Sequence, residues 1–377
     1  MQRGGHETSR RAFVAGTAAA GGVLILGMSG CAEAKTNAAD PRLADYEMPL
    51  ESARHERTIM QWPVSLDVYD PPSLRAVQSK IALIANTIGQ FEPVVMLVAG
   101  ASAKSARMQL DGAVEIWDIP TDDLWCRDSG PTFLKNAAGQ LAIAHIQFNG
   151  WGNKQPHRND ARIAAAIAKR LGLPLLNTGL VGEQGGIEHD GARTLLAHTS
   201  CWVNPNRNRG NADQIGSLLK GALGADNMIW APGIKGTDIT DYHIDALARF
   251  VSPGRVLIQL PESVDRNDRW SVAAFETYEI LKRATDAKGR KLEIIIVPEP
   301  VNIRSSKADF VASYVNYYVC NGAVINAEFG DKKADAKAQG MLRDLYPDRK
   351  VVTLNVDAIG DNGGGIHCAT QQQPKAG

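Results

Sequence analysis

The sequence has 377 residues, of which 44% are hydrophobic, and its 41 Lys and Arg residues balance 41 Asp and Glu residues. A chain of this length can bury a large core, but its length alone allows either one α/β domain or several. Because the formal net charge is zero, no overall field attracts nucleic acid or an anionic membrane surface, so a local pocket must select any charged ligand.

The first 35 residues are typical of an export signal rather than of a folded segment. Ser9-Arg10-Arg11-Ala12-Phe13 precedes an apolar stretch at 14–28, in the order of a twin-arginine signal. That stretch is shorter than the roughly 20 residues of a membrane-spanning helix. Residues 28–31 also resemble a lipoprotein box that would acylate Cys31, whereas residues 32–34 offer cleavage after Ala34. We therefore expect a periplasmic or lipid-anchored protein whose membrane contact, if it has one, is an anchor at Cys31.

The remainder predicts a tether at 36–47 and one folded domain at 48–377. Amphipathic helices separate several of the predicted strands, and the clearest helix runs from Asp160 to Leu171, with Gly172 after it. This alternation predicts an α/β fold. Short β-branched runs predict strands at 94–98, 142–148, 256–260, 293–297, 324–325 and 351–356.

The cysteines indicate neither a disulfide scaffold nor a metal site. Once Cys31 leaves with the signal, four widely and irregularly spaced cysteines remain. The sequence contains no C-x-x-C or H-x-x-x-H pair, so we expect no metal. Cys126, Cys201 and Cys320 adjoin apolar residues, and we expect them to be small buried side chains.

Two segments in the first half of the chain carry candidate binding residues. Trp125, Arg127 and Asp128 place an aromatic ring, a cation and a carboxylate before a turn, a mixture that suits a planar cationic ligand. A core tryptophan beside an ordinary ion pair is the alternative. In the glycine-rich segment 183–191, Glu188 is the carboxylate expected to point inward, and a solvated hairpin turn is the alternative.

Two later segments carry a base, an anion and a thiol. His243 and Asp245 are two residues apart, so in an extended segment both project from the same face. A hydrogen-bonded surface pair is the alternative. Cys368 lies just beyond Gly363-Gly364-Gly365, where a ligand can approach the backbone closely. A buried, unreactive cysteine is the alternative.

Together these residues fit chemistry on a guanidinium group. A guanidinium is planar and presents a fork of donors, so Asp128 and Asp245 can each accept hydrogen bonds from it and hold its carbon over a thiolate. Cys368 would attack that carbon and His243 would protonate the departing ammonia. Water activated by His243 would then release a ureido product from the thiol.

These segments resemble the agmatine deiminase and bacterial-type peptidylarginine deiminase family, from about Met48 to Pro374. The resemblance implies a pentein fold, a pseudo-fivefold α/β propeller around a central active site, and implies no cofactor. It assigns Cys368 as nucleophile, His243 as acid and base, Asp128 with Asp245 as guanidinium carboxylates, and Trp125 with Glu188 to the substrate channel. The motifs that carry it are His55-Glu56-Arg57-Thr58 with Trp62-Pro63, Trp125 to Phe133, Phe148-Asn149-Gly150-Trp151-Gly152, Asn204-Pro205-Asn206-Arg207, and His367-Cys368 through Gln373-Pro374.

The resemblance implies agmatine as the substrate and a small guanidine as the binding partner. Tyr242 stands where the family usually has Gly, and Gly365 where Asn is frequent. Because these departures adjoin the candidate catalytic residues, two alternatives stay open. One is a peptidylarginine or arginine deiminase that produces citrulline, and the other is a non-catalytic extracytoplasmic protein that binds guanidines.

Overall fold

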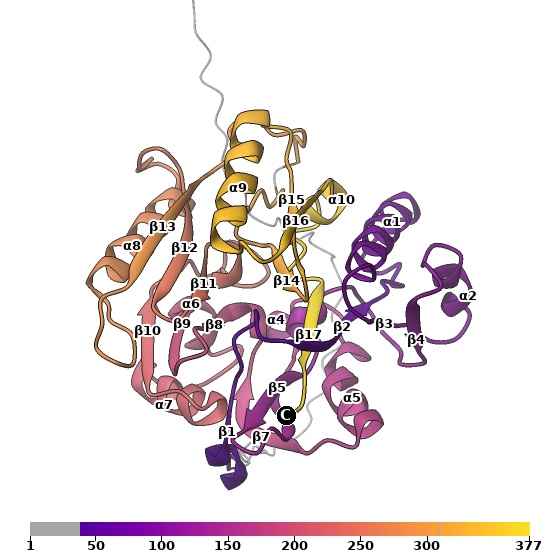
Figure 1. Ribbon diagram of the computed structural model, residues 1–377, viewed down its shortest axis with the longest axis horizontal. Helices are drawn as coiled ribbons and strands as arrows, with labels where there is room; N and C mark the ends of the chain where they lie inside the picture. The colour runs from indigo at the N-terminus through magenta and orange to yellow at the C-terminus, as the bar shows by residue number, and fades with distance from the viewer. Residues whose placement is uncertain (1–37, 308) are drawn as a thin grey trace, which may run out of the picture.

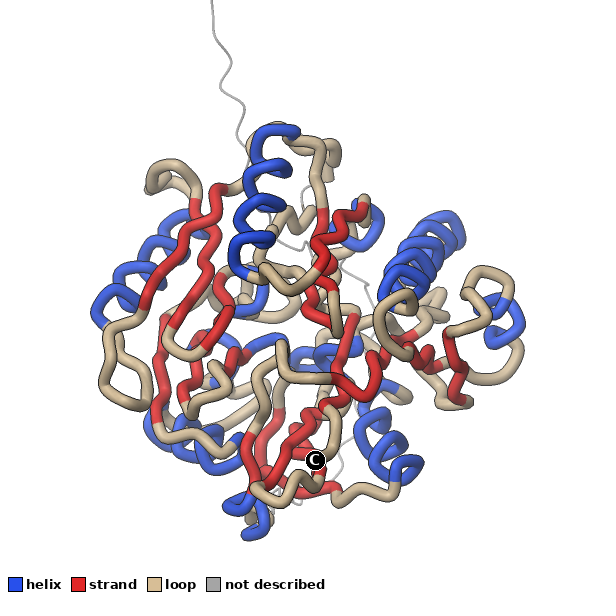
Figure 2. The backbone as a smooth tube through the Cα atoms, in the orientation of Figure 1, coloured by secondary structure: helices blue, strands red, loops and turns tan. Residues whose placement is uncertain are grey.

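The computed structural model describes residues 38–307 and 309–377. The expected signal and Cys31 lie outside the described residues. Within those residues the strands form five small sheets, which surround a common centre (Figure 1). The longer helices lie on the outer side of the strands (Figure 2). This arrangement is the pseudo-fivefold α/β propeller that the sequence predicts.

Each sheet contains the same unit, in which two antiparallel strands are followed by a helix and a third, parallel strand. A parallel neighbour requires a crossover connection, and the helix supplies it. The first unit comprises β5 (Thr132–Asn136), β6 (Leu141–Gln147), α5 (Ile163–Leu171) and β7 (Leu175–Val181). The next three comprise β8 (Ile187–His189), β9 (Thr194–His198), α7 (Ala212–Leu223) and β10 (Asn227–Ala231); β11 (Ala248–Ser252), β12 (Arg255–Leu260), α8 (Arg269–Arg283) and β13 (Glu293–Pro298); and β14 (Tyr318–Cys320), β15 (Ala323–Ala327), α9 (Lys332–Leu345) and β16 (Lys350–Leu354).

The fifth unit closes the ring by joining the two ends of the chain. Its antiparallel pair consists of β17 (Thr370–Pro374) and β2 (His55–Gln61). The helix α1 (Pro71–Ile88) then leads to β3 (Val94–Leu97), and α2 (Ser102–Arg107) leads to the edge strand β4 (Val114–Trp117). Because the pair is antiparallel, the residue after β17 lies beside the residue before β2, where the Lys375 backbone nitrogen donates to the Arg54 carbonyl at 2.8 Å.

The sequence of α1 shows how these helices are specified. Asp70 caps its first turn by accepting a hydrogen bond from the Ser73 backbone nitrogen, and prolines occupy the first helical positions. Val77, Ile81, Ile84 and Ile88 recur at helical spacing and are buried. The helix therefore covers its sheet with one apolar face.

The strand predictions are confirmed, since all six runs fall on strands of the structure (β3, β6, β12, β13, β15 and β16). The helix predicted over 160–171 begins as a 3-10 turn at Asp160–Arg162 and continues as α5. Gly172 ends it in the left-handed conformation, with φ of 65°. Among the described residues no helix is both long and apolar enough to cross a membrane.

The prediction of a tether at 36–47 is wrong for the later part of that segment, which is folded. Pro41–Asp45 forms a 3-10 helix and β1 (Tyr46–Glu47) pairs with β5. Leu43 is buried among the apolar residues that pack around α7. Asp40 caps the 3-10 helix by accepting from the Arg42 backbone nitrogen. The buried Leu43, the cap and the pairing of β1 with β5 together order a segment that is polar by composition.

Candidate active site

The candidate residues lie at equivalent positions of the propeller units, in the segment that enters the first strand of each unit. These segments come from all five units, so their side chains meet at the centre of the ring. Asp128 lies in α3 (Cys126–Ser129) before β5, Glu183 before β8, Asp245 in the 3-10 helix η4 (Ile244–Ala246) with His243 before β11, Asn316 before β14, and Cys368 before β17.

One cavity of about 250 Å³ collects the predicted catalytic residues. Its lining includes Asp128, His243, Asp245 and Cys368, together with the aromatic side chain of Trp125. Residues that are far apart in the sequence therefore face the same small space, as a covalent reaction on a guanidinium requires. The Trp125 ring lies against Gly364, where a Cβ atom would collide with it, so that glycine makes room for the aromatic wall.

Cys368 is the one partly exposed cysteine among the described residues, whereas Cys126, Cys201 and Cys320 are buried, as expected. Its Sγ lies 3.6 Å from Oδ2 of Asp245 and accepts a hydrogen bond from Nδ2 of Asn316 at 3.1 Å. Burial raises the pKa of Cys368 well above the usual thiol range, and the carboxylates of Asp245 and Asp128 raise it further. The empty site therefore holds a neutral thiol, and a cationic ligand between these groups would favour the thiolate.

Asp128 is held by two donors. Nε1 of Trp151 donates to Oδ2 at 2.9 Å and the backbone nitrogen of Gly185 donates to Oδ1 at 3.2 Å. Burial raises the pKa of Asp128 to about 6, although the charge of His243 acts in the opposite direction. At neutral pH the carboxylate is therefore ionised, and its two donors orient it.

His243 lies between two carboxylates. Its Nδ1 is 3.6 Å from Oδ1 of Asp128, and its Nε2 is 3.2 Å from Oε2 of Glu183. Burial acts to lower the pKa of His243, but Asp128 and Glu183 outweigh it and raise that pKa to about 9. The ring is consequently protonated at neutral pH, which is the form that a general acid needs.

Glu183 is itself fixed by Arg207. Nε of Arg207 lies 2.8 Å from both carboxylate oxygens, and neither side chain is more than 2% exposed. Burial opposes ionisation of Glu183, but the guanidinium of Arg207 brings the pKa of Glu183 below its ordinary value. His243 therefore keeps a charged partner on the side away from Asp128.

Asp245 is anchored through one oxygen only. Its Oδ2 lies 2.7 Å from Nδ1 of His367, whereas its Oδ1 has no hydrogen-bond partner among the described residues, although it is buried. Burial opposes ionisation of Asp245, but the hydrogen bond and the charge of His367 lower its pKa. An ionised carboxylate with one unused oxygen at a cavity is suited to accept from a guanidinium.

The segment before His243 adopts a conformation that costs free energy. Asp241 and Tyr242 have φ of 60° and 71°, a region that non-glycine residues rarely adopt and that costs about 1–3 kcal/mol each. Nη1 of Arg207 and Nζ of Lys154 each lie 2.8 Å from the Asp241 carboxylate, and the Tyr242 ring packs between His198 and Trp270. These contacts hold Tyr242 at a position where the resembled family usually has glycine.

Glu188, expected in the substrate channel, does not line this cavity. Its carboxylate accepts from Nε of Arg249 at 3.0 Å and from the backbone nitrogen of Phe250 at 3.2 Å. The glycine-rich segment instead turns Glu183 toward His243. The structure thus corrects which carboxylate of that segment faces the centre, because β8 begins at Ile187 and directs Glu188 to the neighbouring strand β11.

Sequence reasoning missed four groups that contact the predicted residues. Asn316 has no distinctive spacing, and His367 stands in the motif beside Cys368 without a role of its own. Trp151 was present in the motif at 148–152, and its bend is visible in the structure as a φ of 55°. Glu183 stood in the right segment, and only its orientation was unknown.

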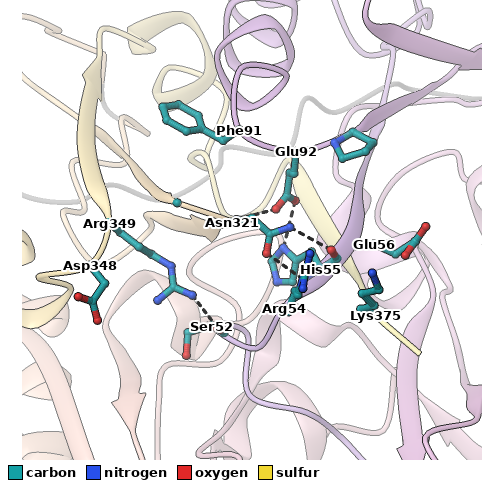
Figure 3. A pocket seen from close by; sticks show the side chains of 12 residues that line it. Ser52, Arg54, His55, Glu56, Phe91, Glu92, Asn321, Asp348, Arg349 and Lys375 are labelled. Atoms are coloured by element: carbon teal, nitrogen blue, oxygen red, sulfur yellow. Dashed lines mark hydrogen bonds and ion pairs between the residues drawn. The ribbon is translucent and has the colours of Figure 1, made fainter. Parts of the chain in front are cut away.

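A second, more open groove of about 760 Å³ lies apart from these residues (Figure 3). It is lined by residues that include Arg54, His55, Glu92 and Arg349, and by none of the predicted catalytic side chains. In the described part of the chain, no group of His, Cys, Asp and Glu side chains has the arrangement of a metal site.

Comparison with known proteins finds the family that the sequence motifs resemble. The model of the Porphyromonas-type peptidyl-arginine deiminase family matches residues 47–374. The agmatine deiminase of Ectopseudomonas mendocina is 34% identical over 360 residues, covering 89% of this chain and 97% of the relative.

Two solved structures are also similar. The agmatine deiminase of Enterococcus faecalis, described as catalysing its reaction, superposes with a TM-score of 0.81 at 28% identity, over 89% of this chain and 98% of that one. A cysteine-to-serine variant of the C. jejuni agmatine deiminase with substrate bound gives a TM-score of 0.78 at 25% identity, over 88% of this chain and 97% of that one.

Proposed function

This chain belongs to the Porphyromonas-type peptidyl-arginine deiminase family, and we propose that it is a hydrolase that converts agmatine and water into N-carbamoylputrescine and ammonia. One observation carries the proposal. The partly exposed thiol of Cys368 shares a cavity with the carboxylates of Asp128 and Asp245 and with a protonated His243. Those are the groups that a covalent deimination needs.

Binding comes first and prepares the nucleophile. The guanidinium of the substrate donates to Asp128 and to the unused Oδ1 of Asp245, so its plane is fixed over Cys368. The positive charge of the substrate offsets the two carboxylates that keep the thiol neutral in the empty site. Cys368 then loses its proton to solvent, and the thiolate forms only when a substrate is present.

The thiolate next attacks the central carbon of the guanidinium. A carbon–sulfur bond forms, and a carbon–nitrogen bond breaks as His243 donates a proton to the departing nitrogen, which leaves as ammonia. The enzyme then carries an amidino-thioether on Cys368. Since His243 is now neutral, it can accept a proton from water that attacks the same carbon. The carbon–sulfur bond breaks, the ureido product leaves, and Cys368 and His243 return to their starting states.

The charge of the cavity favours agmatine over free arginine. Among its described lining residues are six aspartates and no Lys or Arg. Agmatine and arginine both carry an ammonium group at the far end, but arginine carries a carboxylate beside it, which would meet these aspartates with no Lys or Arg of the described lining to pair with. Like-charge contact of this kind is an effective means of rejecting a substrate.

A peptidyl or free arginine substrate is the second candidate. It is favoured by the family description, which names peptidyl-arginine. Release of ammonia from agmatine, arginine and an arginyl peptide, measured side by side at equal concentration, decides between the two. We expect agmatine to have the highest kcat/KM, and an enzyme that turns over an arginyl peptide but not agmatine would contradict the proposal.

We also propose that the enzyme is exported. Ser9-Arg10-Arg11-Ala12-Phe13 and the apolar run after it support a twin-arginine signal. With that signal the enzyme would work in the periplasm, either free or held by a lipid at Cys31.

A further inference from the structure

His367, the residue before the nucleophile, joins two carboxylates that come from opposite ends of the chain. Its Nδ1 lies 2.7 Å from Oδ2 of Asp245, and its Nε2 lies 2.7 Å from Oε2 of Glu51. The imidazole is 3% exposed, and Asp245 is more deeply buried still. The ring therefore forms one link of a buried chain that runs from Glu51 through His367 to Asp245.

The charges of this chain follow from its hydrogen bonds. An ionised carboxylate only accepts hydrogen bonds, so a ring that bonds an ionised carboxylate through each nitrogen carries a proton on both. Burial opposes ionisation of Glu51, but Arg249, His367 and Arg127 bring its pKa well below the ordinary value. Because Asp245 is ionised as well, both ring nitrogens of His367 act as donors, one to Asp245 and one to Glu51.

Glu51 is held firmly enough to orient that ring. Besides His367, it pairs with Nη2 of Arg249 at 2.8 Å and Nη2 of Arg127 at 3.2 Å. Its other oxygen, Oε1, accepts from the backbone nitrogen of Val319 at 3.0 Å. Four groups from separate elements thus converge on one carboxylate, whose side chain is 10% exposed.

The turn that carries Glu51 is also fixed from its far side, at the groove of Figure 3. Nε2 of His55 lies 2.6 Å from the Glu51 carbonyl oxygen, and the other ring nitrogen lies 3.1 Å from Glu92. Nη2 of Arg349 donates to the Ser52 carbonyl at 2.6 Å. Because backbone contacts hold the turn, its position does not depend on the ion pairs alone.

His367 lies in a cluster of charged groups. Around it are the buried carboxylates of Glu188 and Asp245, the partly buried carboxylate of Glu51, and the guanidinium groups of Arg127 and Arg249. The titratable groups near the ring are Glu51 in the turn before β2, Arg127 in α3, Glu188 in β8, Asp245 in η4, His243 before η4, Arg249 in β11 and Cys368 beside it.

We propose that His367 is a positioning residue for the deimination, which keeps Asp245 ionised and leaves its Oδ1 free for the substrate, and that Glu51 orients His367 for this role. The inference rests on the proposed function, because it assigns the guanidinium to Asp245. His367 acts through Asp245 and touches neither the substrate nor the leaving group. Its hydrogen bond to Oδ2 holds the Asp245 carboxylate in one orientation. Oδ1 then accepts from the substrate in a fixed direction.

Loss of the cation should change how the site responds to pH. In the wild-type enzyme the acid limb of kcat/KM follows Asp128, whose pKa is about 6. Without the charge of His367, burial and the nearby Asp128 raise the pKa of Asp245. Asp128 and Asp245 are then both protonated over the same pH range. The acid limb therefore becomes steeper and its midpoint moves to higher pH.

The test compares His367→Asn, Glu51→Gln, their double variant and the control His189→Asn. Asn places an N–H where Nδ1 stood, so His367→Asn keeps a donor to Asp245 but removes the charge and the link to Glu51. His189 is a buried histidine of β8 whose Nδ1 accepts from Gly191 and which contacts neither carboxylate. Thermal melting shows whether each variant folds. If His367→Asn does not fold, the inference is tested with Glu51→Gln.

Two measurements are made on each variant. The first is kcat/KM for agmatine as a function of pH, and the second is calorimetric binding of agmatine with Cys368→Ala added to every variant. We expect His367→Asn to lower both affinity and kcat/KM by on the order of 10- to 100-fold, the worth of a hydrogen bond between charged groups. Its acid limb should move to higher pH, and that of His189→Asn should not move. Glu51→Gln should shift the limb in the same direction by less, and the double variant should be no worse than His367→Asn.

An acid limb that stays in place in His367→Asn and Glu51→Gln would overturn the inference, even if the activity were uniformly lower. A wild-type enzyme that is inert toward agmatine, arginine and arginyl peptide would instead contradict the proposed function. The binding comparison then decides the role of His367 separately. Equal affinities with and without the imidazole would refute it.

Discussion

The backbone of Gly185 is in contact with Asp128 at the point where three functional side chains converge. Its nitrogen donates to Oδ1 of Asp128 at 3.2 Å. A Cβ atom at Gly185 would stand 2.6 Å from Oδ1 of Asp128, 2.8 Å from Nδ1 of His243 and 3.3 Å from Oδ2 of Asp245. The space beside Gly185 therefore cannot accommodate a side chain unless Asp128 or His243 moves.

Gly185→Ala should cripple catalysis because the methyl group would displace Asp128 and His243 from each other. We expect kcat/KM for agmatine to fall by on the order of 100-fold or more, as for other misplacements of about 1 Å. Gly221→Ala in α7 is the matched control, since no atom lies near the new methyl group. It should leave activity intact and raise the free energy of unfolding by about 0.5–1 kcal/mol. Equal activity of the two variants would refute the crowding argument.

The pH profile of kcat/KM should be bell-shaped. Asp128 must be ionised to hold the guanidinium, so the rate rises as pH increases through its pKa of about 6. His243 must be protonated to release ammonia, so the rate falls as pH passes its pKa of about 9. A profile measured with saturating coupling enzyme at each pH checks both limbs. A plateau that extends well above pH 9 would contradict the assignment of His243 as the acid.

Glu183→Gln should move the alkaline limb to lower pH. Glu183 is one of the two carboxylates that raise the pKa of His243, and Gln retains the shape without the charge. We expect kcat near pH 8 to fall by about 10²-fold or more, within the range for general acid catalysis. Glu188→Gln is the comparison, and it should lower kcat far less while reducing stability in urea, because it leaves Arg249 with one buried partner fewer. The reverse order of the two effects on kcat would show that Glu188 faces the substrate after all.

The sequence predicted the fold class and the chemistry well, for physical reasons. Strands such as 256–260 are short, mostly apolar runs that include β-branched residues, and α5 shows apolar residues at helical spacing, so local patterns were sufficient. Cys368, His243 and both aspartates stood out because reactive groups lay in glycine-rich or turn segments. Their common position before the first strand of a unit could not be inferred, because the five units share no visible residue pattern.

The choice between Glu183 and Glu188 shows the limit of such patterns. Both lie in the same polar segment, and which of them points inward depends on where β8 begins. A shift of one residue in a strand exchanges its faces, so composition cannot settle the orientation. His367 could not be assigned a role for another reason, since its partner Glu51 is 316 residues away and meets it only in the folded chain.

The proposed export can be tested in cells. Replacing Arg10 and Arg11 together with Lys should retain the protein in the cytoplasm, since a twin-arginine signal is read through its arginines. Immunoblotting of periplasmic, membrane and cytoplasmic fractions measures the distribution. Cys31→Ala should release a membrane-bound form into the soluble fraction if the cysteine is acylated. An unchanged distribution of the double Lys variant would contradict the signal assignment.

The covalent role of Cys368 is tested most directly by rapid acid quenching of the enzyme during agmatine turnover, followed by peptide mass spectrometry. The account predicts that the peptide containing Cys368 gains the mass of agmatine less one ammonia, that Cys126, Cys201 and Cys320 remain unmodified, and that Cys368→Ala shows no adduct and no turnover. Ammonia release by Cys368→Ala at the wild-type rate, or an adduct on another residue, would contradict it.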